Sequence, residues 1–302
     1  MSAHDRRGFF GELLRSVARV GAEVDEALGS LRGTQAGDNA DATDGDDFEL
    51  EVVDAAPAEN AATVDDVRRL CAELGKAGWA DEAAGAASIS VRLTHGGGSS
   101  RLGGAAPLPP GEQWPVHDGE PLTLVLSLDL PELGPLPLEG RVLLLFCALE
   151  EPEVARVLLT GPDGPLVSEG PALPEVPLQA SRELVLPAVP PSLELDPTDL
   201  DTWTRLRAHL ALLQGVPLEE QAADYHGLHR LLGEPDLVAH AMDEQAAGDE
   251  DGTEAADWRL LLQVSSDPAA ELRLPAFERL YTWIPRQDLS AGRLDRCRTF
   301  VA

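Results

Sequence analysis

The chain has 302 residues, of which 43% are apolar, so it is long enough to bury a substantial core. Its 53 acidic residues outnumber 23 basic ones and give a formal net charge of −30 at pH 7. This balance argues against nucleic acid and anionic membranes as partners, because phosphate groups attract Lys and Arg. No run of about 18 apolar residues is present, and Cys71, Cys147 and Cys297 lack disulfide or metal-ligand spacing. We therefore expect a cytoplasmic protein with free thiols.

The first 30 residues predict an amphipathic helix. Its apolar stripe follows spacings of three and four, and the residues we single out for partner binding are Phe10, Leu13, Leu14 and Val17. From residue 33 to residue 67 the chain holds eleven acidic residues and no Lys or Arg, which predicts a disordered linker over residues 31–62. A helix on such a tether binds either a partner protein or the chain's own core, and both remain open.

The segment Asp5-Arg6-Arg7-Gly8-Phe9-Phe10 resembles the start of a twin-arginine export signal. Such a signal needs an uncharged apolar segment next, whereas Glu12, Arg15 and Arg19 interrupt the residues that follow. The sequence therefore favours retention in the cytoplasm over export.

The folded part of the chain is expected to begin at Thr63. This residue suits the cap of a helix, because Asp65 and Asp66 fall in the first turn, where the helix dipole favours negative charge. Residues 88–94 alternate with the period of a strand. The glycine-rich residues 95–100 then predict a flexible turn, which lacks the spacing of a phosphate-binding loop.

Residues 101–149 carry the strongest pattern. Arg101-Leu102-Gly103-Gly104, Pro107-Leu108-Pro109 and Trp114-Pro115 precede a strand over 122–130. In this strand Leu residues at every second position face one way. Residues 142–146 are apolar on both faces and predict a central strand.

This order of motifs resembles the opening of the YwqG-like (DUF1963) family of uncharacterised proteins. The other end of the chain matches through His229-Arg230-Leu231-Leu232-Gly233-Glu234-Pro235-Asp236, Trp258–Val264 and Leu280–Ile284. The resemblance covers about residues 99–302 and implies a fold but no catalytic residue. Compared with the family pattern, Ser127 stands in place of a Gln and Glu234 in place of a Gly.

The two ends of this region also resemble each other. Leu124 matches Leu260 and Leu126 matches Leu262 at one constant offset, and Gly103-Gly104 matches Gly233-Glu234. We therefore predict an internal repeat over about residues 99–150 and 229–302. The expected fold is α+β and β-rich, with two similar β units around a shared core, a few peripheral helices and a single domain over 63–302.

The residues between the repeats differ from them in composition. Residues 150–197 are rich in proline and predict edge strands and turns. A helix is expected from Asp201 to Gly215 and a second over 218–232. Residues 243–257 hold seven acidic residues and no basic ones, which predicts an exposed loop.

No pattern of catalytic or metal-binding residues stands out. His226 and His229 are three residues apart, but no third metal ligand is identified, so the favoured interpretation of His229 is a hydrogen bond to a neighbouring loop. The G-x-S-x-G elbow of serine hydrolases and the ligand spacing of a calcium loop are both absent. We expect no catalytic residue, no metal and no cofactor.

The remaining candidate site is a groove between the two repeats. The residues we single out for ligand or partner binding there are Arg101, Trp114, His117, Gln263 and Trp283. Tryptophans that only fill the core are the alternative. We expect a non-catalytic binding or accessory protein that engages a protein partner through the N-terminal helix or this groove. The alternative function is an enzyme or a small-ligand binder with its site in the groove.

Overall fold

The computed structural model describes residues 62–108, 111–138, 140, 142–160, 166–167, 170–188, 190, 193, 196–216, 228–235, 257–274 and 279–301. The predicted N-terminal helix, the acidic linker up to residue 61 and the acidic loop over 243–256 lie outside these residues. The chain divides into two compact units, Met1–Ala86 with Val189–Leu218, and Ala87–Ala188 with Glu219–Ala302. Among the described residues the first unit is helical and the second is built on a β-sheet.

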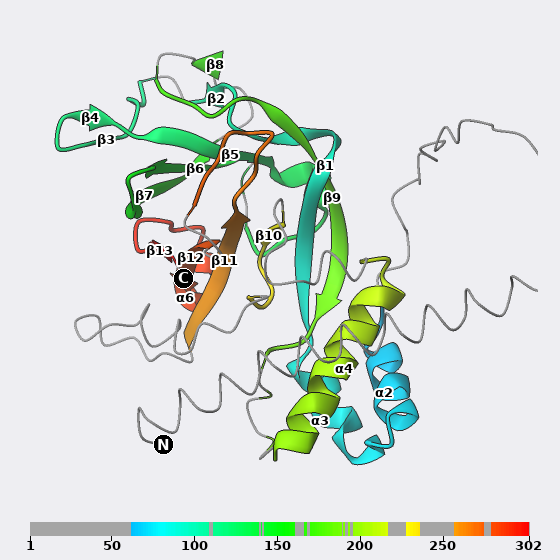
Figure 1. The fold of residues 1–302 in the computed structure, drawn as a ribbon. Coiled ribbons are helices and arrows are strands. Elements are labelled where there is room, and N and C mark those ends of the chain that lie inside the picture. Colours follow the sequence, from blue (N-terminus) through cyan, green and yellow to red (C-terminus); the bar gives the residue numbers. More distant parts are fainter. Residues whose placement is uncertain are drawn as a thin grey trace, which may run out of the picture. The chain divides into compact units, whose positions relative to one another are not determined.

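The helical unit shows how local sequence starts its helices. Its described elements are α2 (Val64–Glu73), η1 (Ala77–Trp79), α3 (Ala80–Ala86) and α4 (Pro197–Leu213) (Figure 1). The predicted cap at Thr63 is confirmed, because its hydroxyl accepts the backbone N–H of Asp66 and the Asp66 carboxylate accepts that of Thr63. Helix α4 begins before the predicted Asp201, since Asp196 caps it and proline suits the first turn.

Aromatic contacts hold the helices of this unit together. The rings of Trp79 and Trp203 lie 6.3 Å apart in an edge-to-face arrangement. Lys76, the only lysine of the chain, forms an ion pair with Asp199 and lies 4.7 Å from the centre of the Trp79 ring. In the described part of the chain, no helix combines the length and the apolar character needed to cross a membrane.

The β-sheet unit contains one large sheet and two short strand pairs. Its described strands are β1 (Ser88–Leu102), β2 (Ala106–Pro107), β3 (Val116–His117), β4 (Glu120–Pro121), β5 (Thr123–Asp129), β6 (Val142–Ala148), β7 (Glu151–Thr160), β8 (Leu166–Val167), β9 (Val176–Val185), β10 (His229–Leu231), β11 (Trp258–Ser265), β12 (Arg279–Pro285) and β13 (Arg298–Val301). The short helices η2 (Leu130–Leu133) and α6 (Arg286–Ser290) join them.

Strand β1 is the spine of the large sheet. Strand β9 pairs along one of its edges, and β10 and β5 pair at different points along the other edge. Two arms therefore leave the same strand: a first arm of β5, β6 and β7, and a second arm of β10, β11, β12 and β13 (Figure 1). The predicted β-rich α+β class is confirmed.

The two arms pack around one shared apolar core. Side chains from both arms fill it, among them Leu126, Leu128 and Leu143 from the first and Leu262, Val264 and Leu280 from the second. Strands β7 and β13, which end the sheet, come together without pairing. We call the face of each arm that is turned away from this core its far face. On the first arm it forms a second, smaller core that includes Leu124, Leu144 and Phe146.

The two arms share one hydrogen-bond frame. Strand β5 has a bulge at Val125, and β11 has one at the matching position, Leu261. The N–H of Gly103 donates to the carbonyl of Val125 at 2.9 Å, and the N–H of Leu232 donates to that of Leu261 at 2.9 Å. The offset that relates Leu124 to Leu260 is therefore present in the backbone pairing. The end of β1 corresponds to β10, β5 to β11, β6 to β12 and β7 to β13.

This frame corrects the predicted match of the glycine pairs by one residue. Gly103 and Gly104 have φ values of +56° and +76°, and the residues with equivalent values are Leu232 at +61° and Gly233 at +83°. Leu232 thus takes the left-handed conformation of Gly103, which is uncommon for a branched side chain.

The prediction of a flexible turn over residues 95–100 was wrong. These residues continue β1 and pair with β9 through a bulge between His95 and Ser100. Two of the three glycines are needed because β9 approaches closely: a Cβ would lie 2.5 Å from the side chain of Gln179 at Gly96 and 2.0 Å from the carbonyl oxygen of Leu178 at Gly98. Close contact with a distant strand, rather than flexibility, explains this run.

The structure corrects two further predictions. The strict alternation over 122–130 breaks at the β5 bulge, so Leu124 lies in the far-face core whereas Leu126 lies in the shared core. The helix expected over 218–232 is contradicted at its end. His229–Leu231 forms strand β10 between β1 and β11, and residues 218–227 lie outside the described part.

Candidate functional site

The far face of the second arm carries aromatic and polar side chains. The bulge in β11 places Trp258, Leu260 and Gln263 on this face. Strand β12 adds Tyr281, opposite Gln263, and Trp283, opposite Leu260. All five side chains are buried, and the most exposed of them is Trp283 at 7%.

The equivalent positions of the first arm hold different chemistry. Where the second arm has Trp258, Gln263, Tyr281 and Trp283, the first arm has, in the same order, Leu122, Ser127, Leu144 and Phe146. Apart from the serine, these are hydrocarbon side chains that pack with Ala106 and Leu108. The same backbone frame therefore folds without polar groups at these positions.

The two tryptophans of the second arm present unpaired donors. No described residue accepts the indole N–H of Trp258, which is 1% exposed, or that of Trp283. An unpaired buried donor costs about 1–3 kcal/mol of stability. By contrast, Trp114 over the first arm donates its indole N–H to the carbonyl of Leu122 at 2.7 Å.

An ion-pair cluster lies beside this face on β1, β9 and β10. The Nε of Arg230 donates to the carboxylate of Glu183 at 2.7 Å, and the Nε of Arg92 lies 3.9 Å from the other oxygen. Glu183 is 3% exposed and Arg230 is 9% exposed. Breaking such a buried pair from one side leaves an uncompensated charge.

A carboxylate between two imidazoles forms a second polar cluster. Asp267, in the turn after β11, accepts through Oδ2 from the Nε2 of His95 at 2.6 Å and of His229 at 3.1 Å. Its Oδ1 accepts the backbone N–H groups of Ala269 at 2.9 Å and Ala270 at 3.2 Å. The predicted hydrogen bond from His229 to a neighbouring loop is confirmed.

The charge state of this cluster follows from its contacts. Burial raises the pKa of Asp267, but the hydrogen bonds from His229 and His95 outweigh it and hold that pKa well below its usual range. Burial lowers the pKa of His229, and the bond to Asp267 opposes this. Asp267 therefore stays ionised with both oxygens occupied, which suits an anchor for the turn better than a group that exchanges protons.

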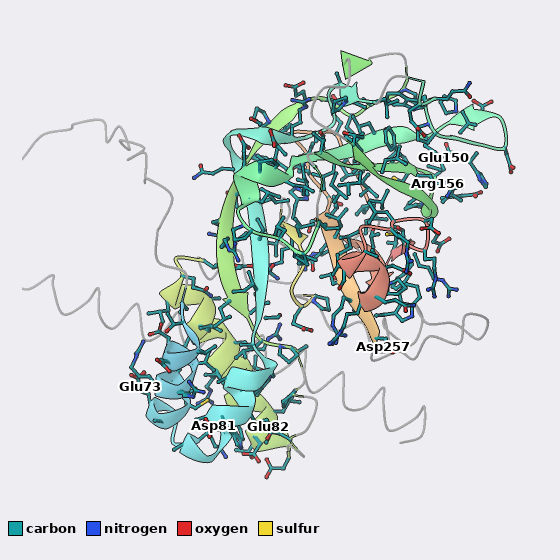
Figure 2. All side chains as sticks on the ribbon, turned by 180° about the vertical axis from the view of Figure 1, so that it is seen from behind. Glu73, Asp81, Glu82, Glu150, Arg156 and Asp257 are labelled. Carbon is teal, nitrogen blue, oxygen red and sulfur yellow. The ribbon has the colours of Figure 1, made fainter. Side chains whose placement is uncertain are left out.

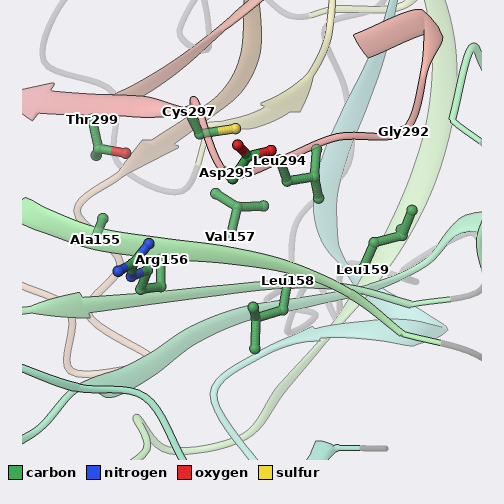
Figure 3. Close-up of a pocket in the computed structure, with 10 residues that line it drawn as sticks. All are labelled: Ala155, Arg156, Val157, Leu158, Leu159, Gly292, Leu294, Asp295, Cys297 and Thr299. Atoms are coloured by element: carbon green, nitrogen blue, oxygen red, sulfur yellow. The ribbon is translucent and has the colours of Figure 1, made fainter. Parts of the chain in front are cut away.

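A pocket of about 330 Å³ opens at the seam where β7 meets the segment that leads into β13 (Figure 3). We call it the seam pocket. It is lined by Ala155, Arg156, Val157, Leu158, Leu159, Gly292, Leu294, Asp295, Cys297 and Thr299. In Figure 3, Val157 points from β7 toward the segment that carries Cys297, whereas Leu158 points to the opposite side of the strand.

The seam pocket combines apolar walls with four polar residues, Arg156, Asp295, Cys297 and Thr299. Burial, together with the neighbouring carboxylates of Asp295 and Asp288, raises the pKa of the Cys297 thiol to about 12. The thiol is therefore protonated at neutral pH and is a poor nucleophile. The hydroxyl of Thr299 lies 3.0 Å from that of Thr282 and is engaged in a hydrogen bond.

The structure does not bring the five predicted groove residues together. Gln263 and Trp283 lie on the far face of the second arm. Arg101, at the end of β1, donates to a backbone carbonyl four residues away, and Trp114 packs against Phe146 with ring centres 5.1 Å apart. His117 is exposed in the β3–β4 hairpin. The other predicted contact residues lie outside the described part of the chain: Phe10, Leu13, Leu14 and Val17.

Sequence reasoning missed several polar residues that the fold gathers. Asp267 and His95 are 172 residues apart, and nothing local marks them as partners. In the sequence Cys297 is only a lone cysteine, and nothing indicates that it lines a pocket. The internal repeat could have pointed to the strand that carries Arg298, because β13 follows β12 in the second arm as β7 follows β6 in the first. Among the described residues, no group of three or more His, Cys, Asp or Glu could hold a metal ion.

Comparison with known proteins gives a family without an assigned role. A family model described as "Domain of unknown function (DUF1963)" matches residues 100–301. The comparison with curated proteins gives no match.

Proposed function

The chain belongs to the DUF1963 family, and from this premise we propose that it is a non-catalytic binding protein that holds an apolar side chain of a protein partner in the seam pocket. The proposal places the expected groove between the repeats at the junction of their last strands, β7 and β13.

One observation carries the proposal, namely the size and lining of the seam pocket. Its volume of about 330 Å³ is at the lower end of the range for binding pockets. Ala155, Val157, Leu159 and Leu294 supply apolar walls. A pocket of this kind suits a single anchoring side chain, and such anchors dominate the energy of protein interfaces.

The polar groups of the seam pocket support binding rather than chemistry. The Cys297 thiol is protonated, and the Thr299 hydroxyl is already hydrogen-bonded. A nucleophilic thiol would need a lowered pKa, whereas the pKa of Cys297 is raised.

The surroundings of the seam pocket indicate the charge of the partner. Glu151 and Glu153 are exposed at the start of β7, the strand that supplies one wall of the seam pocket, and Glu150, labelled in Figure 2, is exposed in the turn before it. A partner with Lys or Arg beside its apolar anchor would complement these carboxylates, and charges at the rim of an interface raise the rate of association.

The test compares two phenylalanine substitutions on the same strand. Ala155→Phe fills the seam pocket, whereas Glu153→Phe adds the same ring at an exposed position two residues away. Affinity purification with the full chain from its native host should recover a partner with wild type and Glu153→Phe but not with Ala155→Phe. Far-UV circular dichroism and thermal unfolding establish that each variant folds. Equal recovery with all three folded proteins would overturn the proposal.

The predicted N-terminal helix is tested in the same experiment. A chain lacking residues 1–30 should still recover the partner if the seam pocket is the main contact. Loss of the partner with this chain alone would move the contact to Phe10, Leu13, Leu14 and Val17, whose role stays a prediction.

One observation favours the alternative function of an enzyme. His95, Asp267 and His229 converge, and the pKa values of Asp267 and His229 are shifted, as is common at catalytic sites. The occupied oxygens of Asp267 weaken this interpretation. A turnover that His95→Asn removes and Ala155→Phe leaves intact would establish the enzyme instead.

A further inference from the structure

Two tryptophans with unpaired indole N–H donors are neighbours on the far face of the second arm. Trp283 of β12 is directly opposite Leu260 of β11, and Trp258 is two residues before Leu260 on the same face. Both tryptophans are more than nine-tenths buried, and no described residue accepts either N–H. Buried polar groups without partners are rare in native structures and call for a reason.

Arg298 lies over the ring of one tryptophan and is the strand partner of the other. Arg298 of β13 is directly opposite Trp283, on the edge of β12 that is away from β11. Its guanidinium nevertheless lies 5.3 Å from the centre of the Trp258 ring, so the side chain crosses over β12. Arg298 is partly exposed, which places solvent on this side of the cluster.

The three groups have one property in common. Indole N–H and guanidinium are donors only, and neither accepts a hydrogen bond. A ligand that fits them must supply acceptors, and charge-assisted bonds to an oxyanion are the strongest of this kind. We propose that Trp258, Trp283 and Arg298 form a binding site for a small oxyanion, a carboxylate or a phosphate.

The internal repeat shows that the fold itself does not require these donors. The first arm uses Leu122 in place of Trp258 and Phe146 in place of Trp283 on the same backbone frame. The tryptophans therefore add donors where hydrocarbon is sufficient for packing. The chain carries a net charge of −30, so an oxyanion binds only where a cation such as Arg298 offsets this charge.

The test uses a matched pair of probes with the full chain. Malonate carries two carboxylates, and malonamide has nearly the same shape with no charge. Isothermal titration calorimetry at constant ionic strength, adjusted with sodium chloride, separates specific binding from general screening of the acidic chain. Malonate or inorganic phosphate should bind in the millimolar range or tighter, and malonamide should not bind.

The variants replace each tryptophan with the residue of the other arm. Trp258→Leu and Trp283→Phe should each weaken anion binding about tenfold, as expected for the loss of a hydrogen bond to a charged group. Arg298→Gln should weaken it at least as much. Trp114→Phe is the control, because the indole N–H of Trp114 already has an acceptor.

The outcomes separate this site from the seam pocket. Ala155→Phe should leave malonate binding unchanged, so that loss of a partner and loss of anion binding are independent results. Equal affinity for malonamide would show that the site does not select anions. Anion binding that survives Trp258→Leu and Trp283→Phe would place it elsewhere, and no binding of either anion to the folded wild type would refute the site.

Discussion

Replacing Asp267 with Asn tests the polar cluster at the turn after β11. The change keeps the shape of the side chain but removes the charge that accepts from His95, His229 and two backbone N–H groups. One end of the Asn side chain is an NH₂ group, which is a donor. It would face either the imidazole N–H groups or the two backbone N–H groups, so that donors meet donors. If the imidazoles change tautomer to accept, the buried Nδ1 of His229, which has no partner among the described residues, becomes an unpaired donor.

The size of the loss follows from these contacts. A hydrogen bond to a charged group contributes about 1.5–3 kcal/mol, so we expect Asp267→Asn to lower the free energy of unfolding at pH 7 by about 3 kcal/mol. For a unit of this size, that corresponds to a drop of about 6–12 °C in the unfolding temperature. The pKa of Asp267 is depressed in the folded state, so its contribution is complete above about pH 3.9, the value for a free Asp, and is lost below it.

The assay is urea unfolding followed by circular dichroism, with a matched control. His117 and Asp118 form an exposed pair 3.6 Å apart, so Asp118→Asn should change stability by less than about 0.5 kcal/mol. If Asp267→Asn also changes stability no more than this control does, the imidazoles and the turn do not depend on the Asp267 carboxylate.

Three further changes test other parts of the account. Glu183→Gln removes the buried carboxylate that accepts from Arg230 and should cost about 3–5 kcal/mol in urea unfolding, and a neutral result would contradict a stabilising ion pair. Gly103→Ala, where a Cβ would lie 2.0 Å from a carbonyl oxygen, should reduce thermal stability far more than Gly119→Ala, which has open space; equal effects would refute the close approach. Burial depresses the pKa of His229, so the folded protein loses stability as pH falls below about 6.5, by at most about 1.4 kcal/mol per pH unit for one proton. His229→Gln should remove this part of the loss. An unchanged dependence of stability on pH would exclude His229 as its source.

Features that depend on nearby residues were predictable from the sequence. The cap at Thr63 needs only a partner three residues away, and the Leu-rich strand predicted over 122–130 is present as β5, although its alternation breaks at the bulge. The repeat was also visible, because both arms keep apolar residues at one constant offset, as Leu124 and Leu260 do. The family resemblance followed from the order of the same motifs.

Features that depend on distant backbone were not predictable. The glycines of residues 96–98 suggested a loop, whereas Gly96 and Gly98 make room for β9 within a continuous strand. The bulge at Val125 reverses which Leu residues share a face, and the residue pattern alone does not reveal it.

The candidate sites were predicted only in part. Gln263 and Trp283 were identified because they lie on recurring strands, and the structure places both on one face. The seam pocket was not predicted. Its residues on β7 follow an ordinary strand alternation, and the pocket forms only because β13 lies beside β7 in the folded chain. Asp267 and His95 meet only because β1 and the turn after β11 come together in the sheet.

Photo-crosslinking from the seam pocket is the most direct test of the proposed binding role. The full chain would carry p-benzoylphenylalanine either in place of Arg156, which lines the pocket, or in place of Glu153, which does not; both residues are exposed on the same strand. We predict that irradiation in the native host gives an adduct with one partner protein from position 156 and little from position 153. Equal adducts from both positions, or none from position 156, would contradict binding at the seam pocket.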